Sequence, residues 1–280
     1  MQDVAFHNSI RSQQREVSLL FADLRGFTEL AASLEMIPLV CELIGHVLDC
    51  LTDAVNRHHG CVVDYYGDGL LAMWNAPTDQ PEHAELACSA ALEMLETLPC
   101  VTKDWVPVIQ SDLRLGIGVH SGLVQVGNAG STRQAKYGPR GPNVHLASRV
   151  EVATKSLCVP LIATTPTVQG LSDRFATGRI CRARMPGLHE PTDLYAVWSS
   201  TSETRLHAAW QLYDEALRHF EQGRLQEAAD IVTTLDGKDT AVPWSFLAGE
   251  VQRELGREQR RRSTDQKSDC RFGVITLSVK

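Results

Sequence analysis

Apolar and polar positions along the chain follow two different periods, and together they predict a protein of mixed helices and strands. Residues 16–24, EVSLLFADL, form a largely apolar run, which predicts a strand buried on both faces. A short helix is expected to start at Thr28. Over residues 37–58 the apolar positions recur every three or four residues, which predicts an amphipathic helix that ends at Gly60.

The middle of the chain predicts a hairpin and then further helices and strands. The hairpin is expected from two apolar runs, 61–66 and 70–75, on either side of the turn residues GDG. The later elements are a helix over 81–98, a strand pair over 113–128 bent at Ser121 and Gly122, a helix over 143–155 entered from the loop YGPRG, and strands over 159–164 and 192–198. The order β-α-α-β-β-α-β-β-α-β indicates an α+β fold with helices on a central sheet.

The composition changes after Trp198, where a polar linker begins. Residues 206–235 predict a helix, a glycine turn and a second helix, which resembles a single tetratricopeptide-like hairpin. One such hairpin cannot bury its own apolar face, so we expect it to dock on the main domain or on a protein partner. The expected division of the chain is 1–15 as an N-terminal lead-in, 16–198 as the main domain, 204–256 as the helical hairpin and 257–280 as a charged tail.

Charge and cysteine content narrow the class of protein. A net charge of −7 argues against a nucleic-acid binder, which would carry a basic face. We expect no membrane span and no signal peptide, and therefore a cytoplasmic protein. The eight cysteines show no zinc-binding spacing, and most lie among apolar residues. They are expected to be buried free thiols in a reducing compartment.

Two acidic residues stand where predicted strands end. Asp23 follows an apolar run, and Asp68 lies between two glycines at the tip of the predicted hairpin. Two such carboxylates could hold divalent cations, because magnesium takes few protein carboxylates and completes its shell with phosphate and water oxygens. Two ions could then flank a phosphoryl group. Each acid taken alone is equally typical of a helix cap or a tight turn.

Three motifs together suggest a family. FADLRGFT, GDGLLAMW and NVHLASRVE, in this order, resemble the catalytic domain of class III adenylate and guanylate cyclases over roughly residues 16–198. The resemblance implies a ferredoxin-like nucleotide cyclase sandwich, here followed by a C-terminal helical hairpin. It also implies a head-to-tail homodimer with shared sites, two Mg²⁺ or Mn²⁺ ions per site, and conversion of ATP or GTP to the 3′,5′-cyclic nucleotide and pyrophosphate in intracellular signalling.

The resemblance also assigns roles to individual residues. Asp23 and Asp68 match the two metal-binding aspartates. Arg149 matches an arginine that stabilises the α-phosphoryl charge from the other chain. Contacts with the triphosphate are expected at the start of the next helix, whose backbone amides face the substrate: Gly26, Phe27 and Thr28.

Two positions depart from the family pattern on the catalytic side. His145 stands where an asparagine orients the ribose, and a neutral histidine can still donate one hydrogen bond. Pro186 stands where a lysine contacts phosphate, and Arg184 is a possible replacement. These departures leave open a second reading, in which the chain is a catalytically weakened regulatory module that binds nucleotide or a partner cyclase chain. A diguanylate cyclase is a third reading, but the chain lacks a GGDEF-type signature.

The base-reading positions also depart from the pattern. Asp64 stands where adenylate cyclases carry an adenine-reading lysine, and Gly138 occupies the second purine-reading position. A carboxylate at position 64 could accept hydrogen bonds from guanine N1 and N2, with Arg140 reaching O6. Bacterial-looking members of the family mostly use ATP, so the choice between ATP and GTP stays open.

Overall fold

The computed structural model describes residues 12–26, 37–105, 113–131, 135–187, 190–201, 204–235, 242–264 and 273–277. Its elements are β1 (Gln13–Arg25), α2 (Ile37–Arg57), β2 (Cys61–Tyr66), β3 (Gly69–Trp74), α3 (His83–Thr102), β4 (Arg114–Gly130), β5 (Ala135–Arg140), α5 (Pro142–Leu157), β6 (Leu161–Thr164), α6 (Thr165–Val168), β7 (Phe175–Arg184), β8 (Thr192–Ser199), α7 (Thr204–Glu221), α8 (Leu225–Leu235), α9 (Trp244–Thr264) and β9 (Ile275–Thr276).

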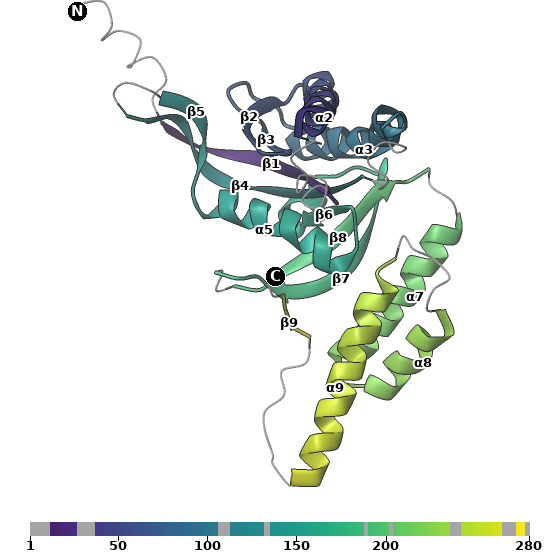
Figure 1. Ribbon diagram of the computed structural model, residues 1–280. Coiled ribbons are helices and arrows are strands. Elements are labelled where there is room, and N and C mark those ends of the chain that lie inside the picture. Colours follow the sequence, from purple (N-terminus) through teal and green to yellow (C-terminus); the bar gives the residue numbers. More distant parts are fainter. Residues whose placement is uncertain are drawn as a thin grey trace, which may run out of the picture.

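One sheet organises the molecule, and helices cover both of its faces (Figure 1). Among the described residues the strand order is β2-β3-β1-β4-β6-β8-β7-β9, with β5 paired to β4. β4 with β6 and β7 with β9 are parallel pairs, and the other pairs are antiparallel. Helices α2 and α3 lie on one face of the sheet, and α5 and α7 lie on the other. This α+β sandwich confirms the predicted fold class.

β1 is buried on both faces, as its apolar run predicts. Leu20 and Leu24 pack in the core beneath α2 and α3, whereas Val17 and Leu19 belong to the core on the α5 side. Because side chains alternate along a strand, Asp23 lies on the α5 side at the end of β1.

Helix α5 lies unusually close to β4. Gly118 of β4 sits directly beneath the helix, and a Cβ atom added there would clash with the backbone of Glu151. The glycines of the GIGVHSG segment therefore seat a helix on the sheet. This close approach fixes the height and rotation of α5, which carries His145 and Arg149.

The sequence analysis was wrong about residues 113–128. They do not form a strand pair bent at Ser121 and Gly122, because β4 continues through both residues without a turn. The strand that follows β4 in the chain and pairs with its second half is β5, which the sequence analysis assigned to a loop. Strand β7 was also missed.

The C-terminal helices share a core with the sheet. α7 and α8 form the predicted hairpin around Gly223, which has φ +73°. A third helix, α9, was not predicted, and it continues past residue 256, where the sequence analysis ends the hairpin. The Tyr213 hydroxyl donates a hydrogen bond to the carbonyl oxygen of Ile180 on β7 (3.0 Å), and Trp210 stacks on Trp198 of β8. The hairpin thus docks on the main domain.

The prediction that the cysteine thiols are buried is confirmed for only some of the cysteines. Cys88 and Cys181 are buried, whereas Cys41, Cys100 and Cys158 are exposed. None of the helices in the described part of the chain is long and apolar enough to cross a membrane.

Docking of α7 can be tested by truncating Trp210, which is 5% exposed. We expect Trp210→Ala to lower the free energy of unfolding by about 3–5 kcal/mol, because a large cavity would open between helix and sheet. Leu212→Ala on the same helix, at a side chain that is 38% exposed, is the control and should cost about 1 kcal/mol or less. Denaturant unfolding measures both, and equal losses would contradict the docked arrangement.

Candidate active site

The structure brings Asp23 and Asp68 together at one end of the sheet. In the β1–β3 pairing Ala22 lies opposite Leu70, which carries the β2–β3 turn to the end of β1. Gly69 permits this approach, because a Cβ atom added there would lie 2.5 Å from the Ala22 carbonyl oxygen and 3.0 Å from Asp23 Oδ1. The two acids that the sequence analysis selected therefore face one location.

The surroundings of both carboxyl groups disfavour their ionised forms. Burial raises the pKa of Asp23, and the neighbouring Asp68 raises it further, while Arg25 and Lys155 act in the opposite direction. Burial also raises the pKa of Asp68. A divalent cation would relieve this repulsion, so the pair fits the expected metal. Within the described residues no group of three or more His, Cys, Asp or Glu side chains could hold a metal, so further oxygen ligands would come from substrate or water.

Arg25 connects the Asp23 carboxylate to helix α5. Its Nη1 lies 3.3 Å from Asp23 Oδ2, and its Nη2 forms an ion pair with Glu151. The same Nη2 donates to the Glu151 carbonyl oxygen (3.1 Å) and to Thr154 Oγ1 (2.8 Å). Burial raises the pKa of Glu151 to about 7, although Arg25 favours its ionised form. This network ties α5 to the acid pair of its own chain.

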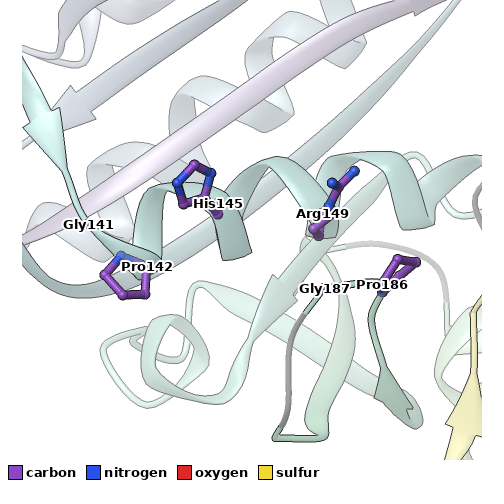
Figure 2. Close-up of a pocket in the computed structure, with 6 residues that line it drawn as sticks. All are labelled: Gly141, Pro142, His145, Arg149, Pro186 and Gly187. Carbon is purple, nitrogen blue, oxygen red and sulfur yellow. The ribbon is translucent and has the colours of Figure 1, made fainter.

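A pocket lies beside α5, on a different side of the helix from the acid pair Asp23 and Asp68. Figure 2 shows His145 and Arg149 one helical turn apart, with Pro186 and Gly187 beside them. These residues, together with Gly141 and Pro142, line a pocket of about 430 Å³. His145 is exposed and Arg149 is partly buried. The sequence-predicted catalytic residues and the substituted position Pro186 therefore share one pocket.

The acid pair and this pocket are separated by the geometry of α5. Residues two positions apart on a helix project about 200° apart. Glu151 faces Asp23 through Arg25, so Arg149 projects away from the acid pair of its own chain. One chain thus presents two sets of candidate site residues that face in different directions.

A buried hydrogen-bond network, which the sequence analysis missed, holds the start of α5. His120 lies 2.7 Å from Thr164 Oγ1 through Nδ1 and 3.1 Å from Asn143 Oδ1 through Nε2. Asn143 Nδ2 donates to the carbonyl oxygen of Leu123 (2.8 Å). Both ends of the Asn143 amide are engaged, so this asparagine cannot replace the one that is absent at His145.

The residues predicted to read the base lie on β2 and β5, two strands that do not pair with each other in the sheet. Asp64 on β2 forms an ion pair with Lys136 on β5, and its Oδ1 accepts a hydrogen bond from the Tyr65 backbone amide (3.0 Å). These partners, Lys136 above all, lower the pKa of Asp64. Gly138 lies two residues beyond Lys136 on the same face of β5, and Arg140 is exposed at the end of that strand. Asp64 is therefore paired with Lys136, a cation that the sequence analysis did not consider.

The remaining predicted residues lie in different places. Gly26, with φ +87°, follows β1 and lines a cavity of about 840 Å³ with Asp23 and Arg25. Phe27 and Thr28 lie outside the described residues. Arg184 is exposed at the end of β7, where its backbone pairs with β9.

The sequence analysis did not predict Lys136 or Glu151 as site residues. Lys136 would have emerged from strand alternation with Gly138, but β5 had been assigned to a loop. In the sequence, Glu151 is an ordinary polar residue of a helix. Only the packing of α5 on the sheet brings its side chain to Arg25.

Comparison with known proteins identifies the class that this fold and site define. Residues 10–199 match the family described as the adenylate and guanylate cyclase catalytic domain. The chain therefore belongs to this family.

Individual relatives agree with that assignment. Adenylate cyclase 1 of Rhizobium meliloti (strain 1021) is 28% identical over 184 residues, which cover 66% of this chain and 28% of the relative. An adenylate cyclase of Anabaena cylindrica is 29% identical over 189 residues, covering 65% of this chain and 37% of the relative. The chain thus spans about a third of the length of these curated relatives.

Solved structures share the fold. The guanylyl cyclase Cya2 has a TM-score of 0.60 and 27% identity over 69% of this chain and 96% of that one. The adenylyl cyclase CyaB of P. aeruginosa has a TM-score of 0.63 and 23% identity over 69% of this chain and 98% of that one. The segment from α7 to β9 lies beyond the family match, which ends at residue 199.

Proposed function

We propose that this chain is a purine nucleotide cyclase that converts ATP or GTP to the 3′,5′-cyclic nucleotide and pyrophosphate. The observation that carries the proposal is the convergence of Asp23 and Asp68 at the ends of β1 and the β2–β3 turn, with raised pKa values that a cation would relieve. Nucleoside triphosphates are cytoplasmic solutes, so we place the activity in the cytoplasm and in intracellular signalling.

In this reaction the ribose 3′-oxygen forms a bond to the α-phosphorus, and the bond from that phosphorus to the β-phosphate oxygen breaks. The 3′-hydroxyl proton is lost, and pyrophosphate leaves. Asp23 and Asp68 would hold two Mg²⁺ or Mn²⁺ ions, which acidify the hydroxyl and neutralise phosphoryl charge when bound. Arg149 would donate hydrogen bonds to the α-phosphoryl oxygens, and His145 would orient the ribose.

We infer that the working unit is a head-to-tail homodimer. The acid pair and the pocket of His145 and Arg149 project from different sides of α5, so the two half-sites of one chain cannot close on one substrate. Two copies would each supply one half to each of two equivalent sites.

A second function has specific support. His145 and Pro186 line the catalytic pocket in place of an asparagine and a lysine, so the pocket has lost a fixed amide and a positive charge. A chain weakened in this way would bind nucleotide or a partner cyclase chain and act as a regulatory module, with the C-terminal helices as the contact for a protein partner. The retained Asp23, Asp68 and Arg149 favour catalysis.

The acid pair provides the direct test. We expect Asp23→Asn and Asp68→Asn each to lower cyclic nucleotide formation by about two orders of magnitude or more, because a metal clamp supplies several kcal/mol of transition-state stabilisation. The matched control is Asp53→Asn, an exposed acid on α2. Product formed from ATP and from GTP with Mn²⁺ or Mg²⁺ is the measurement. Folded variants with near wild-type turnover would refute the metal assignment.

Base selection depends on Asp64 and Lys136. We infer that the carboxylate accepts from guanine N1 and N2 while the ammonium donates to O6, which favours GTP. Reversing the pair with Asp64→Lys and Lys136→Asp would present a donor to adenine N1 and an acceptor to N6. We expect the double variant to shift the ATP-to-GTP ratio of kcat/KM towards ATP by about one to two orders of magnitude.

Two comparisons sharpen this experiment. Gly138→Asp is a poorer probe, because its Cβ would lie 2.9 Å from Val63 Cγ1. Reversal of the Arg57–Glu93 pair, on α2 and α3, is the control and should leave the ratio unchanged. An active double variant with an unaltered ratio would show that Asp64 and Lys136 do not face the base.

A further inference from the structure

The strand β9 returns from the C-terminal helices to the edge of the catalytic sheet (Figure 1). It runs parallel to the end of β7, with Ile275 opposite Ala183 and Thr276 opposite Arg184, and the Leu277 amide donates to the Arg184 carbonyl oxygen (3.1 Å). Ile275 and Leu277 are 5% and 8% exposed, whereas the intervening Thr276 is exposed. The apolar side chains of Ile275 on β9 and of Leu277, directly after it, therefore enter the core.

Leu277 lies at the junction between α5 and the end of β7. It lines a cavity of only about 10 Å³ with Arg149, Ala153, Met185 and Pro186 among its neighbours. A space of this size is at the lower limit for one water molecule, so the junction is closely packed. Leu277 thus acts as an apolar wedge between the helix and the chain that follows β7.

The other side of this junction is the catalytic pocket. Arg149 and Pro186 line both the small cavity at Leu277 and the pocket of about 430 Å³ that contains His145 (Figure 2). The spacing between Arg149 and the chain at Pro186 is therefore set in part by what fills the space behind them. Arg149 is partly buried, and the side chains that line the small cavity contribute to its position.

The start of β9 is joined to the helices. Gly273, with φ +98°, lies beside the end of α7, where an added Cβ would be 3.5 Å from Glu221 Cγ. Glu221 in turn pairs with Arg179 of β7, with Oε1 2.7 Å from Nη2, and Arg179 also pairs with Asp193 of β8. This arrangement fixes β9 between α7 and the catalytic sheet.

We propose that Leu277 is a positioning residue for catalysis, which holds Arg149 and Pro186 at the separation that the substrate phosphates require. The proposal rests on the cyclase function proposed above. It makes β9, a segment beyond the family match, a structural part of the catalytic unit. It also gives the helices α7–α9 a direct mechanical connection to Arg149.

The test is Leu277→Ala in the chain of 280 residues. We expect kcat to fall by between about ten- and a hundredfold, because small displacements of a catalytic group are costly, while KM changes little. Leu247→Ala is the matched control, since Leu247 is fully buried in the same core but lies on α9 away from the pocket. It should destabilise the chain without lowering kcat to this extent. Leu277→Met, which keeps the volume, should retain activity.

A second readout does not depend on turnover. Hydrogen exchange should quicken in residues 145–157 for Leu277→Ala, whereas Leu247→Ala should quicken exchange mainly in α7–α9. If both variants lower kcat equally and show the same exchange pattern, Leu277 is merely a core residue and the proposal fails. If the wild-type chain forms no cyclic product from ATP or GTP, the cyclase function fails, and the exchange comparison alone decides whether Leu277 holds the helix of Arg149.

Discussion

The close seating of α5 on β4 is the constraint on which the two half-sites depend. Gly118 offers the helix no side chain, so the backbone at Glu151 comes directly onto the strand. At that height Glu151 reaches Arg25, and Arg25 reaches Asp23. The rotation that brings Glu151 to the acid pair also directs Arg149 to the opposite side. A single helix therefore fixes the directions of both half-sites.

Charge in the proposed metal half-site is balanced only partly by the protein. Two desolvated carboxylates stand together, and Arg25 divides its guanidinium between Asp23 and Glu151. The buried carboxyl of Glu151, with a pKa raised to about 7, adds to the cost of ionising this corner. A cation would balance the remaining negative charge of this site. In its absence, Arg25 and Glu151 hold the carboxylate of Asp23 in its orientation. The same pair gives α5 its firm connection to β1.

The pattern of apolar and polar residues correctly predicted those helices, strands and turns whose structure depends mainly on residues close together in the sequence. The apolar run of β1, the hairpin around Gly67 and the helical period of α5 all follow from neighbouring residues, whereas the approach of Asp23 to Asp68 depends on the pairing of β1 with β3. The prediction for residues 113–128 failed because Ser121-Gly122 is typical of a turn, whereas Gly122 here makes room for the Asn143 side chain at the start of α5. β9 could not be predicted, because its pairing with β7 joins segments about 90 residues apart. Lys136 was not predicted as a site residue, because its strand, β5, was assigned to a loop.

The central claim is that the half-sites of one chain are completed by a second copy. It is tested by mixing inactive Asp23→Ala chains with inactive Arg149→Ala chains under conditions in which subunit exchange is verified with mass-tagged protein. We predict recovery of about a quarter of wild-type activity, because half of the randomly formed dimers are mixed and one of their two sites is intact. Asp23→Ala mixed with Asp68→Ala should recover nothing, since both changes fall in the same half-site. Absence of recovery in the first mixture, despite exchange, would contradict the shared site.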